Sequence, residues 1–169
     1  DELTYATSLT TELFRIPKKM DWTPPNKNIA VIKVDIPYTM LPANKFIKSA
    51  KEAGYNIVID EISQFGRIDW GTTLTKIERT KPSYIVLMLL DPTDTARFQI
   101  QFNEKFAKKG FPAIIVSQYS PSVPEYLAIA GKEVAEGVIH MGGAIRTQYP
   151  EVAEYVKRWE EKYNEKPFD

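Results

Sequence analysis

The sequence contains no cysteine, and it lacks an excess of charge of either sign. Without cysteine, disulfide frameworks, zinc–cysteine centres and thiol catalysis are excluded. Lysine and arginine together number 22, as do aspartate and glutamate, so the formal net charge is zero. This balance predicts neither a nucleic-acid partner nor binding to an anionic membrane surface.

Long hydrophobic runs are also missing. A membrane-spanning helix requires roughly 20 apolar residues, and the longest run here, 84–90, has only the length of a β-strand. The chain begins with Asp1-Glu2-Leu3, without a methionine or a signal peptide. We therefore expect it to have been processed or excised from a longer protein.

The motifs of common catalytic sites are absent as well. The sequence has no dinucleotide-binding G-x-G-x-x-G, no phosphate-binding G-x-x-x-x-G-K-[ST] and no nucleophile elbow G-x-S-x-G. The only histidine, His140, falls within a predicted strand, where we expect a packed side chain rather than a catalytic one. We expect neither an enzyme nor a cofactor. One alternative stays open, a flavodoxin-like enzyme in which Asp35 and Asp91 coordinate Mg²⁺.

What the sequence does contain is a regular alternation of short apolar runs and amphipathic segments. The runs are apolar at nearly every position, which is typical of strands buried on both faces of a parallel sheet. They span residues 29–34, 56–62, 83–90, 113–117 and 137–141.

The segments between these runs have the apolar spacing of helices. Residues 43–50 follow the i, i+3, i+4, i+7 pattern and are stopped by Gly54. A helix that carries phenylalanines at 98, 102 and 106 is expected to be capped by Asp94, and the helix after Trp70 by Asp69. Two further helices are expected before Pro17 and after Pro150.

Strands that alternate with helices predict an α/β fold. We expect a three-layer αβα sandwich around a parallel, five-stranded, doubly wound sheet of flavodoxin-like order 2-1-3-4-5. A chain of 169 residues has room for one such domain. Residues 1–149 should form a single α/β lobe, and 150–169 a separate C-terminal helix.

A sheet of this order predicts where a ligand binds. Ligands lie beyond the carboxyl ends of the strands, at the point where the strand order reverses. The loops there follow the first, third and fourth strands, and their candidate ligand-binding residues are Asp35, Tyr38, Asp91, Pro92, Gln118, Tyr119 and Ser120. The aspartates and tyrosines among them could instead have purely structural roles, because aspartates cap helices or form turns and tyrosines cover the edge of a core.

Blocks along nearly the whole chain carry a family resemblance. They are Asn26 to Ile32 with Asp35 and Tyr38; Gly66 to Trp70 with Lys81-Pro82; Phe98 to Phe102; Gln118 to Tyr126 with Gly131 and Ala135 to Val138; and Pro150 to Pro167. In this order and spacing they resemble the second lobe of type I periplasmic binding proteins, of the branched-chain-amino-acid receptor family that serves ABC transporters.

The resemblance implies that this chain is the C-terminal lobe of a two-lobe extracytoplasmic solute-binding protein. The missing N-terminal lobe and an ABC transporter permease would be its partners. The location would be periplasmic or extracellular, with a lipid anchor or tether outside this chain. A small polar solute, such as an amino acid or amide, would contact Tyr38, Asp91 with Pro92, and Gln118 or Tyr119. Gly142 and Gly143 would form the hinge, and the helix from Pro150 would lead back to the other lobe.

One position departs from the family pattern. Amino-acid-specific members often carry a glutamate after the fourth strand, where it faces the ammonium group of the ligand. This sequence reads Gln118-Tyr119-Ser120 there. A standard branched-chain amino acid is therefore not indicated unless Asp91 binds the ammonium. A ligand-sensing receptor domain with the same fold is the remaining alternative.

Overall fold

The computed structural model describes residues 2–106, 110–141 and 150–165. Its five parallel strands form one sheet in the order β2-β1-β3-β4-β5, which confirms the predicted topology. The strands are β1 (Asn28–Val34), β2 (Asn56–Ser63), β3 (Tyr84–Met88), β4 (Ile114–Gln118) and β5 (Ile139–Met141).

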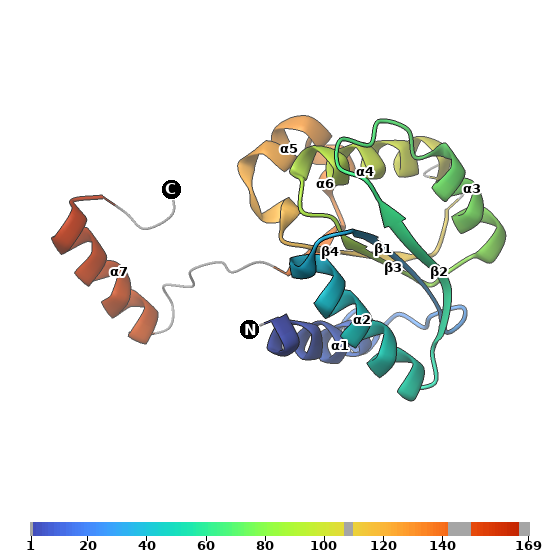
Figure 1. The fold of residues 1–169 in the computed structure, drawn as a ribbon, viewed down its shortest axis with the longest axis horizontal. Helices are drawn as coiled ribbons and strands as arrows, with labels where there is room; N and C mark the ends of the chain where they lie inside the picture. Colours follow the sequence, from blue (N-terminus) through green and yellow to red (C-terminus); the bar gives the residue numbers. More distant parts are fainter. Residues whose placement is uncertain (1, 107–109, 142–149, 166–169) are drawn as a thin grey trace.

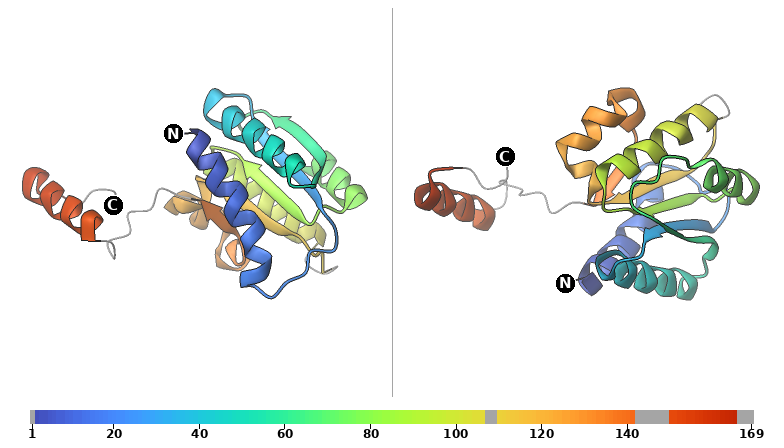
Figure 2. Two further views of the ribbon diagram at one scale, coloured as in Figure 1. Left: turned by 90° about the horizontal axis from the view of Figure 1, so that it is seen from below. Right: turned by 45° about the horizontal axis from the view of Figure 1, so that its top comes forward.

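Helices cover both faces of the sheet and complete the predicted three layers (Figure 1). On one face, α1 (Glu2–Lys19) and α2 (Pro37–Glu52) lie side by side (Figure 2). The other face carries α3 (Gly71–Thr80) and α4 (Pro92–Phe106), with α5 (Pro124–Ala130) and α6 (Lys132–Ala135) against α4. A 3₁₀ turn, η2 (Ser120–Ser122), follows β4, and α7 (Pro150–Tyr163) is the last helix.

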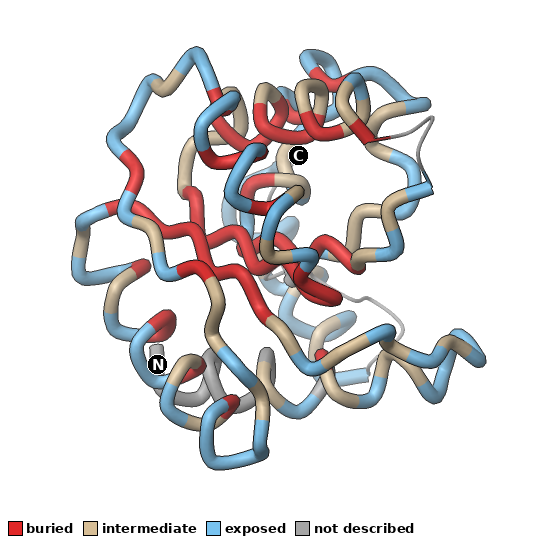
Figure 3. The backbone as a smooth tube through the Cα atoms, turned by 90° about the vertical axis from the view of Figure 1, so that its right-hand side faces the viewer, coloured by how far each residue is buried: buried red, intermediate tan, exposed pale blue. Residues whose placement is uncertain are grey.

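The central strands are apolar at nearly every position because both of their faces are covered. Along β1, Ile29 and Val31 pack into the cluster beneath α1 and α2, whereas Ala30, Ile32 and Val34 pack beneath α3 and α4. The buried stretches in Figure 3 accordingly run through the middle of the sheet. Each apolar side chain removed from water contributes roughly 1.5–3 kcal/mol, so this two-sided core is the main source of stability.

The phenylalanine stripe of α4 forms the centre of one core layer. Phe98 is fully buried, and its ring meets Trp70 edge-on at 5.3 Å between centroids. Phe102 follows at 6.1 Å and Phe106 4.8 Å beyond that. The predicted helical spacing of these residues is confirmed, and it orients α4 on the sheet.

Lys33 is the one charged residue of β1, and its side chain is buried. Its Nζ lies 2.6 Å from the Asp60 carboxylate on β2 and 3.3 Å from Asn44 Oδ1 on α2. A buried ammonium needs such partners, because an unpaired charge away from water is strongly unfavourable. The ion pair links β1 to β2, and the hydrogen bond to Asn44 links β1 to the middle of α2.

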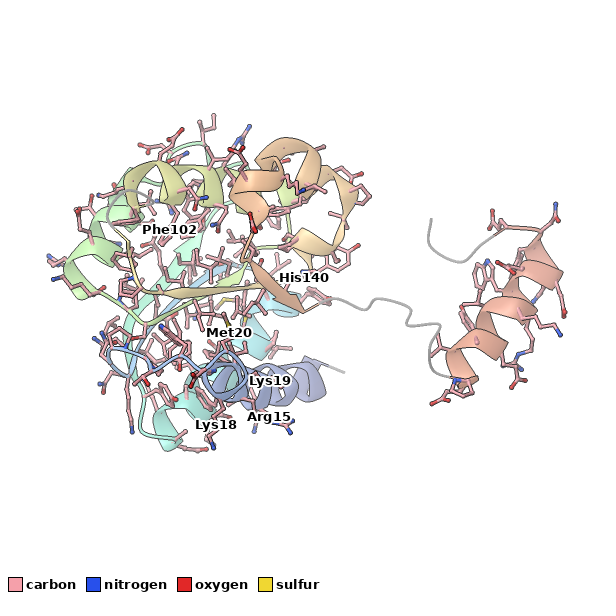
Figure 4. The ribbon with its side chains drawn as sticks, turned by 180° about the vertical axis from the view of Figure 1, so that it is seen from behind. Arg15, Lys18, Lys19, Met20, Phe102 and His140 are labelled. Carbon is pink, nitrogen blue, oxygen red and sulfur yellow. The ribbon has the colours of Figure 1, made fainter. Side chains whose placement is uncertain are left out.

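His140 was predicted to be packed, and this prediction is wrong. The residue is exposed on β5, which lies at the edge of the sheet and pairs only with β4 (Figure 4). Sequence pattern alone does not separate an edge strand from a central one. The covering expected for His140 is not provided by any of the described residues.

Candidate functional site

The carboxyl ends of β1, β3 and β4 lie next to one another at one edge of the sheet. In the parallel register Lys33 of β1 pairs with Met88 of β3, and Leu87 of β3 pairs with Ser117 of β4. The chain leaves β1 towards β2 and leaves β3 towards β4, so the strand order reverses between them. This is the switch point at which open α/β sheets bind ligands, and we refer to it as the carboxyl edge.

The first loop of the carboxyl edge presents Asp35 and Tyr38. Both side chains are exposed, Tyr38 to 47%. The turn beneath them is held by buried Thr39, whose hydroxyl donates to the Val34 carbonyl at 2.6 Å. Helix α2 begins at Pro37 without a side-chain cap. Tyr38 therefore does not cover the core, which was the structural alternative for it.

The second loop is built around Asp91, which caps α4. Its Oδ1 accepts the backbone N–H groups of Thr93 at 2.6 Å and Asp94 at 3.3 Å, and Pro92 occupies the first helical position. The prediction that Asp94 caps this helix is therefore wrong. Asp91 and Asp94 both precede the apolar stripe of α4 in the sequence. Proline favours the first position of a helix, so Pro92 makes Asp91, the residue before it, the cap.

Asp94 instead holds another loop in place. It is buried, and its Oδ2 accepts the Gly66 N–H at 2.9 Å. Burial raises the pKa of the Asp94 carboxyl, although the hydrogen bond from Gly66 opposes that shift. Gly66 has φ +74°, a left-handed conformation that favours glycine.

The third loop separates an exposed tyrosine from two buried neighbours. Tyr119 is 41% exposed, whereas Gln118 is only 4% exposed and Ser120 is fully buried. The Ser120 hydroxyl donates to the Leu89 carbonyl, so it ties this loop to the end of β3. Gln118 Oε1 has no hydrogen-bond partner among the described residues. In this conformation Tyr119 is the member of the trio that a ligand can reach.

Sequence reasoning missed a charged cluster beside this edge. The Glu61 carboxylate of β2 accepts hydrogen bonds from Arg67 and Lys76, each at 2.8 Å, and from the Thr73 hydroxyl. Arg67 also lies over the Trp70 ring at 4.3 Å. The participants are distant in sequence and follow no motif. Asp69 was expected to be the N-cap of α3, but Trp70 occupies that position. Asp69 lies one residue earlier, and its Oδ1 accepts the Gly71 N–H.

Apolar side chains at the ends of strands and helices gather at the same edge. Besides the two tyrosines, the exposed large apolar residues are Leu41 in α2, Ile62 near the end of β2, and Phe65 and Ile68 between β2 and α3. Exposed apolar groups that cluster on one side of a soluble domain mark a surface that contacts something else.

Other predicted features are absent from, or lie outside, the described part of the chain. Within it, no three His, Cys, Asp or Glu side chains gather as they would at a metal site. No described helix is long and apolar enough to cross a membrane. Gly142 and Gly143, the predicted hinge, lie outside the described residues.

Comparison with known proteins decides the family. A family profile described as "Periplasmic binding protein" matches residues 6–169. The chain belongs to the periplasmic binding protein family. No curated protein matches the sequence.

Solved structures of other proteins share the fold. A Silicibacter pomeroyi protein named for a branched-chain amino acid ABC transporter is 26% identical, with a TM-score of 0.81 over 98% of this chain and 40% of its own. A Thermotoga maritima leucine-binding protein is 19% identical, with a TM-score of 0.70 over 96% of this chain and 44% of its own.

A third solved structure is named for a different solute. It is a fatty acid ABC transporter substrate-binding protein from Thermomonospora curvata, 17% identical, with a TM-score of 0.67. The match covers 98% of this chain and 41% of that protein. This chain thus spans less than half the length of each of the three relatives, and none of their names describes an enzyme.

Proposed function

We propose that this chain is the C-terminal lobe of an extracytoplasmic solute-binding protein that delivers a small solute to an ABC transporter permease. The observation that carries the proposal is that one complete five-stranded lobe aligns with only 40% of the Silicibacter protein. The remainder of such a protein has room for a second lobe. The solute would lie between the two lobes, against the carboxyl edge described above.

Within this lobe, we assign the solute contacts chiefly to Tyr38 and Tyr119. Both side chains are exposed at the carboxyl edge, and each offers a ring face together with a hydroxyl that can donate or accept. Asp35 is exposed beside them. Asp91 and Pro92 shape the second loop, and Gln118 and Ser120 support Tyr119 from beneath.

The solute is a small polar compound such as an amino acid or an amide. The relatives named for leucine and for fatty acids show that solutes differ among structures of this fold. In this lobe the residue after β4 is not acidic, and Asp91 Oδ1 already accepts two amides at the start of α4. An ammonium group would therefore depend on Asp35 or on the remaining oxygen of Asp91.

Helix α7 would return the chain to the N-terminal lobe. None of its side chains is buried among the described residues, although it carries an aromatic stripe. The Tyr155 and Trp159 rings lie 6.0 Å apart, and Trp159 and Tyr163 4.5 Å apart. Such a stripe normally packs against another element, and the missing lobe is the candidate.

Binding would proceed without bond chemistry. The solute favours the closed arrangement by touching both lobes, and the hinge at Gly142 and Gly143 absorbs the backbone rotation. Periplasmic or extracellular location and a tether outside this chain follow from the same proposal.

A thermal-shift screen of the full-length two-lobe protein against amino acids, amides, short peptides and sugars tests the proposal. We expect at least one solute to raise the melting temperature. Tyr38→Ala should abolish that shift while leaving the unliganded midpoint nearly unchanged. Met20→Ala removes another exposed side chain, at the far end of α1, and should leave the shift intact. A full-length protein that no small solute stabilises contradicts the proposal.

A further inference from the structure

Basic side chains are concentrated on the outer layer formed by α1 and α2. Arg15, Lys18 and Lys19 follow one another at i, i+3 and i+4 near the end of α1 and are exposed (Figure 4). Lys45, Lys48 and Lys51 line the exposed side of α2, and exposed Lys27 follows α1. We call these seven residues the basic face.

The chain as a whole has zero net charge. The basic face therefore reflects where the basic residues lie and not an overall excess of them. From residue 2 to residue 55 the sequence has eight basic residues and five acidic ones, which are Glu2, Glu12, Asp21, Asp35 and Glu52. Asp35 belongs to the carboxyl edge, at the opposite end of α2 from Glu52. The zero net charge on which the sequence analysis relied therefore conceals a basic layer.

Four lysines of the basic face form no ion pair with any described residue. Lys33, Lys76 and Lys105 each form an ion pair elsewhere in the lobe. Lys18, Lys45, Lys48 and Lys51 have no ion-pair partner among the described residues. A lysine in the last turn interacts favourably with the helix dipole, which accounts for Lys18 and Lys51. It does not account for Lys45 and Lys48, which lie further from the end of α2.

The basic face spans two helices that pack against each other. Phe14 of α1 stacks on Tyr55, just beyond α2, with ring centroids 4.2 Å apart. Lys27 Nζ lies 5.9 Å from the centroid of that same tyrosine, so the ends of both helices and the following loop share one surface. Exposed Met20 adds an apolar side chain next to Lys19 (Figure 4).

We propose that the basic face binds an anionic phospholipid surface. Flexible lysines are compact point charges that attract a diffuse array of phosphates, whereas a defined acidic partner is usually held by the planar fork of arginine. Six of the seven cations here are lysines, and only Arg15 is an arginine. Met20 can enter the headgroup region beside them. A binding protein that serves a membrane transporter would be kept close to the membrane in this way.

Contact with a membrane through the basic face leaves the carboxyl edge, where the solute is proposed to bind, free. Both α1 and α2 end on the side of the sheet where β1 and β2 begin. The chain passes from α1 to β1 through residues 20–27 and from α2 to β2 through a short turn at residues 53–55. Tyr38 and Tyr119 lie at the other edge. This inference therefore does not depend on the proposed solute site.

The test is vesicle binding by the full-length protein, purified in soluble form. We expect binding to phosphatidylglycerol vesicles but not to phosphatidylcholine vesicles, and strong weakening between about 10 and about 150 mM salt, where the Debye length falls severalfold. A lysine near an anionic surface contributes roughly a factor of five. The double variant Lys18→Gln/Lys48→Gln should therefore bind about twentyfold more weakly.

The matched control is Arg79→Gln/Lys132→Gln, which removes the same charge from exposed positions on α3 and α6. It should change vesicle binding less than twofold. Three results overturn the inference: equal binding to neutral vesicles, equal weakening by the two double variants, or no vesicle binding together with salt-dependent binding to an acidic protein. Unchanged far-UV circular dichroism of both variants separates these outcomes from misfolding.

Discussion

Glu61→Gln perturbs the charged cluster that fastens β2, the following loop and α3 to one another. The Glu61 side chain is only 13% exposed, and its two carboxylate oxygens accept hydrogen bonds from Arg67, Thr73 and Lys76. The substitution keeps the size and shape of the side chain and removes its charge. Arg67 and Lys76 then lose their common acidic partner.

The expected loss in the free energy of unfolding lies between two limits. Exposed ion pairs contribute about 0–1 kcal/mol, and removing one partner of a fully buried pair costs about 3–5 kcal/mol. Lys76 is 45% exposed and can find water, but Arg67 is 22% exposed and is covered by Trp70. We expect Glu61→Gln to lower the free energy of unfolding by about 2 kcal/mol.

The expected dependence on pH follows from the sign of the pKa shift. Burial by itself raises the pKa of Glu61, but the hydrogen bonds from Arg67, Lys76 and Thr73 outweigh burial and lower it. A carboxyl group with a lowered pKa stabilises the fold above its unfolded pKa of about 4.3 and loses that contribution as pH falls through the folded value. The difference in the free energy of unfolding between wild type and variant should therefore have its full size at neutral pH and shrink below about pH 4.

Urea unfolding of wild type and variant at several pH values measures both effects, and a thermal scan should show a decrease of about 4–8 °C. Glu78→Gln serves as the control, because Glu78 pairs with Lys105 at 3.0 Å while 43% exposed. That substitution should cost less than about 1 kcal/mol. Equal losses for the two variants, or a Glu61→Gln loss that does not change with pH, would refute the reasoning.

Three further substitutions test other parts of the structure. Phe98→Ala should cost about 3–5 kcal/mol in urea unfolding, because the ring is fully buried against Trp70; a loss below about 1 kcal/mol contradicts the packing. Asp91→Ala should cost about 1 kcal/mol through the lost cap of α4, and Asp91→Asn much less, since an asparagine caps as well; equal losses contradict the capping role. Asp94→Asn addresses a pKa that burial raises. A raised pKa means stability that is present at low pH and lost as pH rises through the folded pKa. The variant should therefore gain stability relative to wild type as pH rises above the unfolded pKa of about 3.9, and a relative loss in the same unfolding assay contradicts the assignment.

The arrangement of strands and helices was predictable because both faces of the sheet are covered. Continuous apolar runs located all five strands, although β3 and β5 are shorter than expected. The predicted fifth strand began at Gly137, whose φ of +80° lies outside the range of extended backbone. The wrong prediction that Asp94 caps α4 arose because Asp91 and Asp94 lie only three residues apart. Pro92, which favours the first position of a helix, would have indicated Asp91.

The exposure of the candidate site residues was not predictable in the same way. The sequence treats Gln118 and Tyr119 alike as polar loop residues, yet one is buried and the other is exposed. That difference follows from where β4 ends, because Gln118 is the last residue of this buried strand and Tyr119 lies beyond it. The Glu61 cluster and the basic face depend on how separate elements come together.

The central claim, that this chain supplies one half of a solute cleft, is tested most directly by isothermal titration of one solute into two proteins. The solute is the one that best stabilises the full-length protein, and the second protein is the 169-residue chain alone. A ligand enclosed by two lobes loses about half of its contacts when one lobe is absent. We predict binding to the full-length protein and at least about a hundredfold weaker binding to the single lobe. Equal affinity for both proteins would contradict the account, because the site would then lie wholly within this chain.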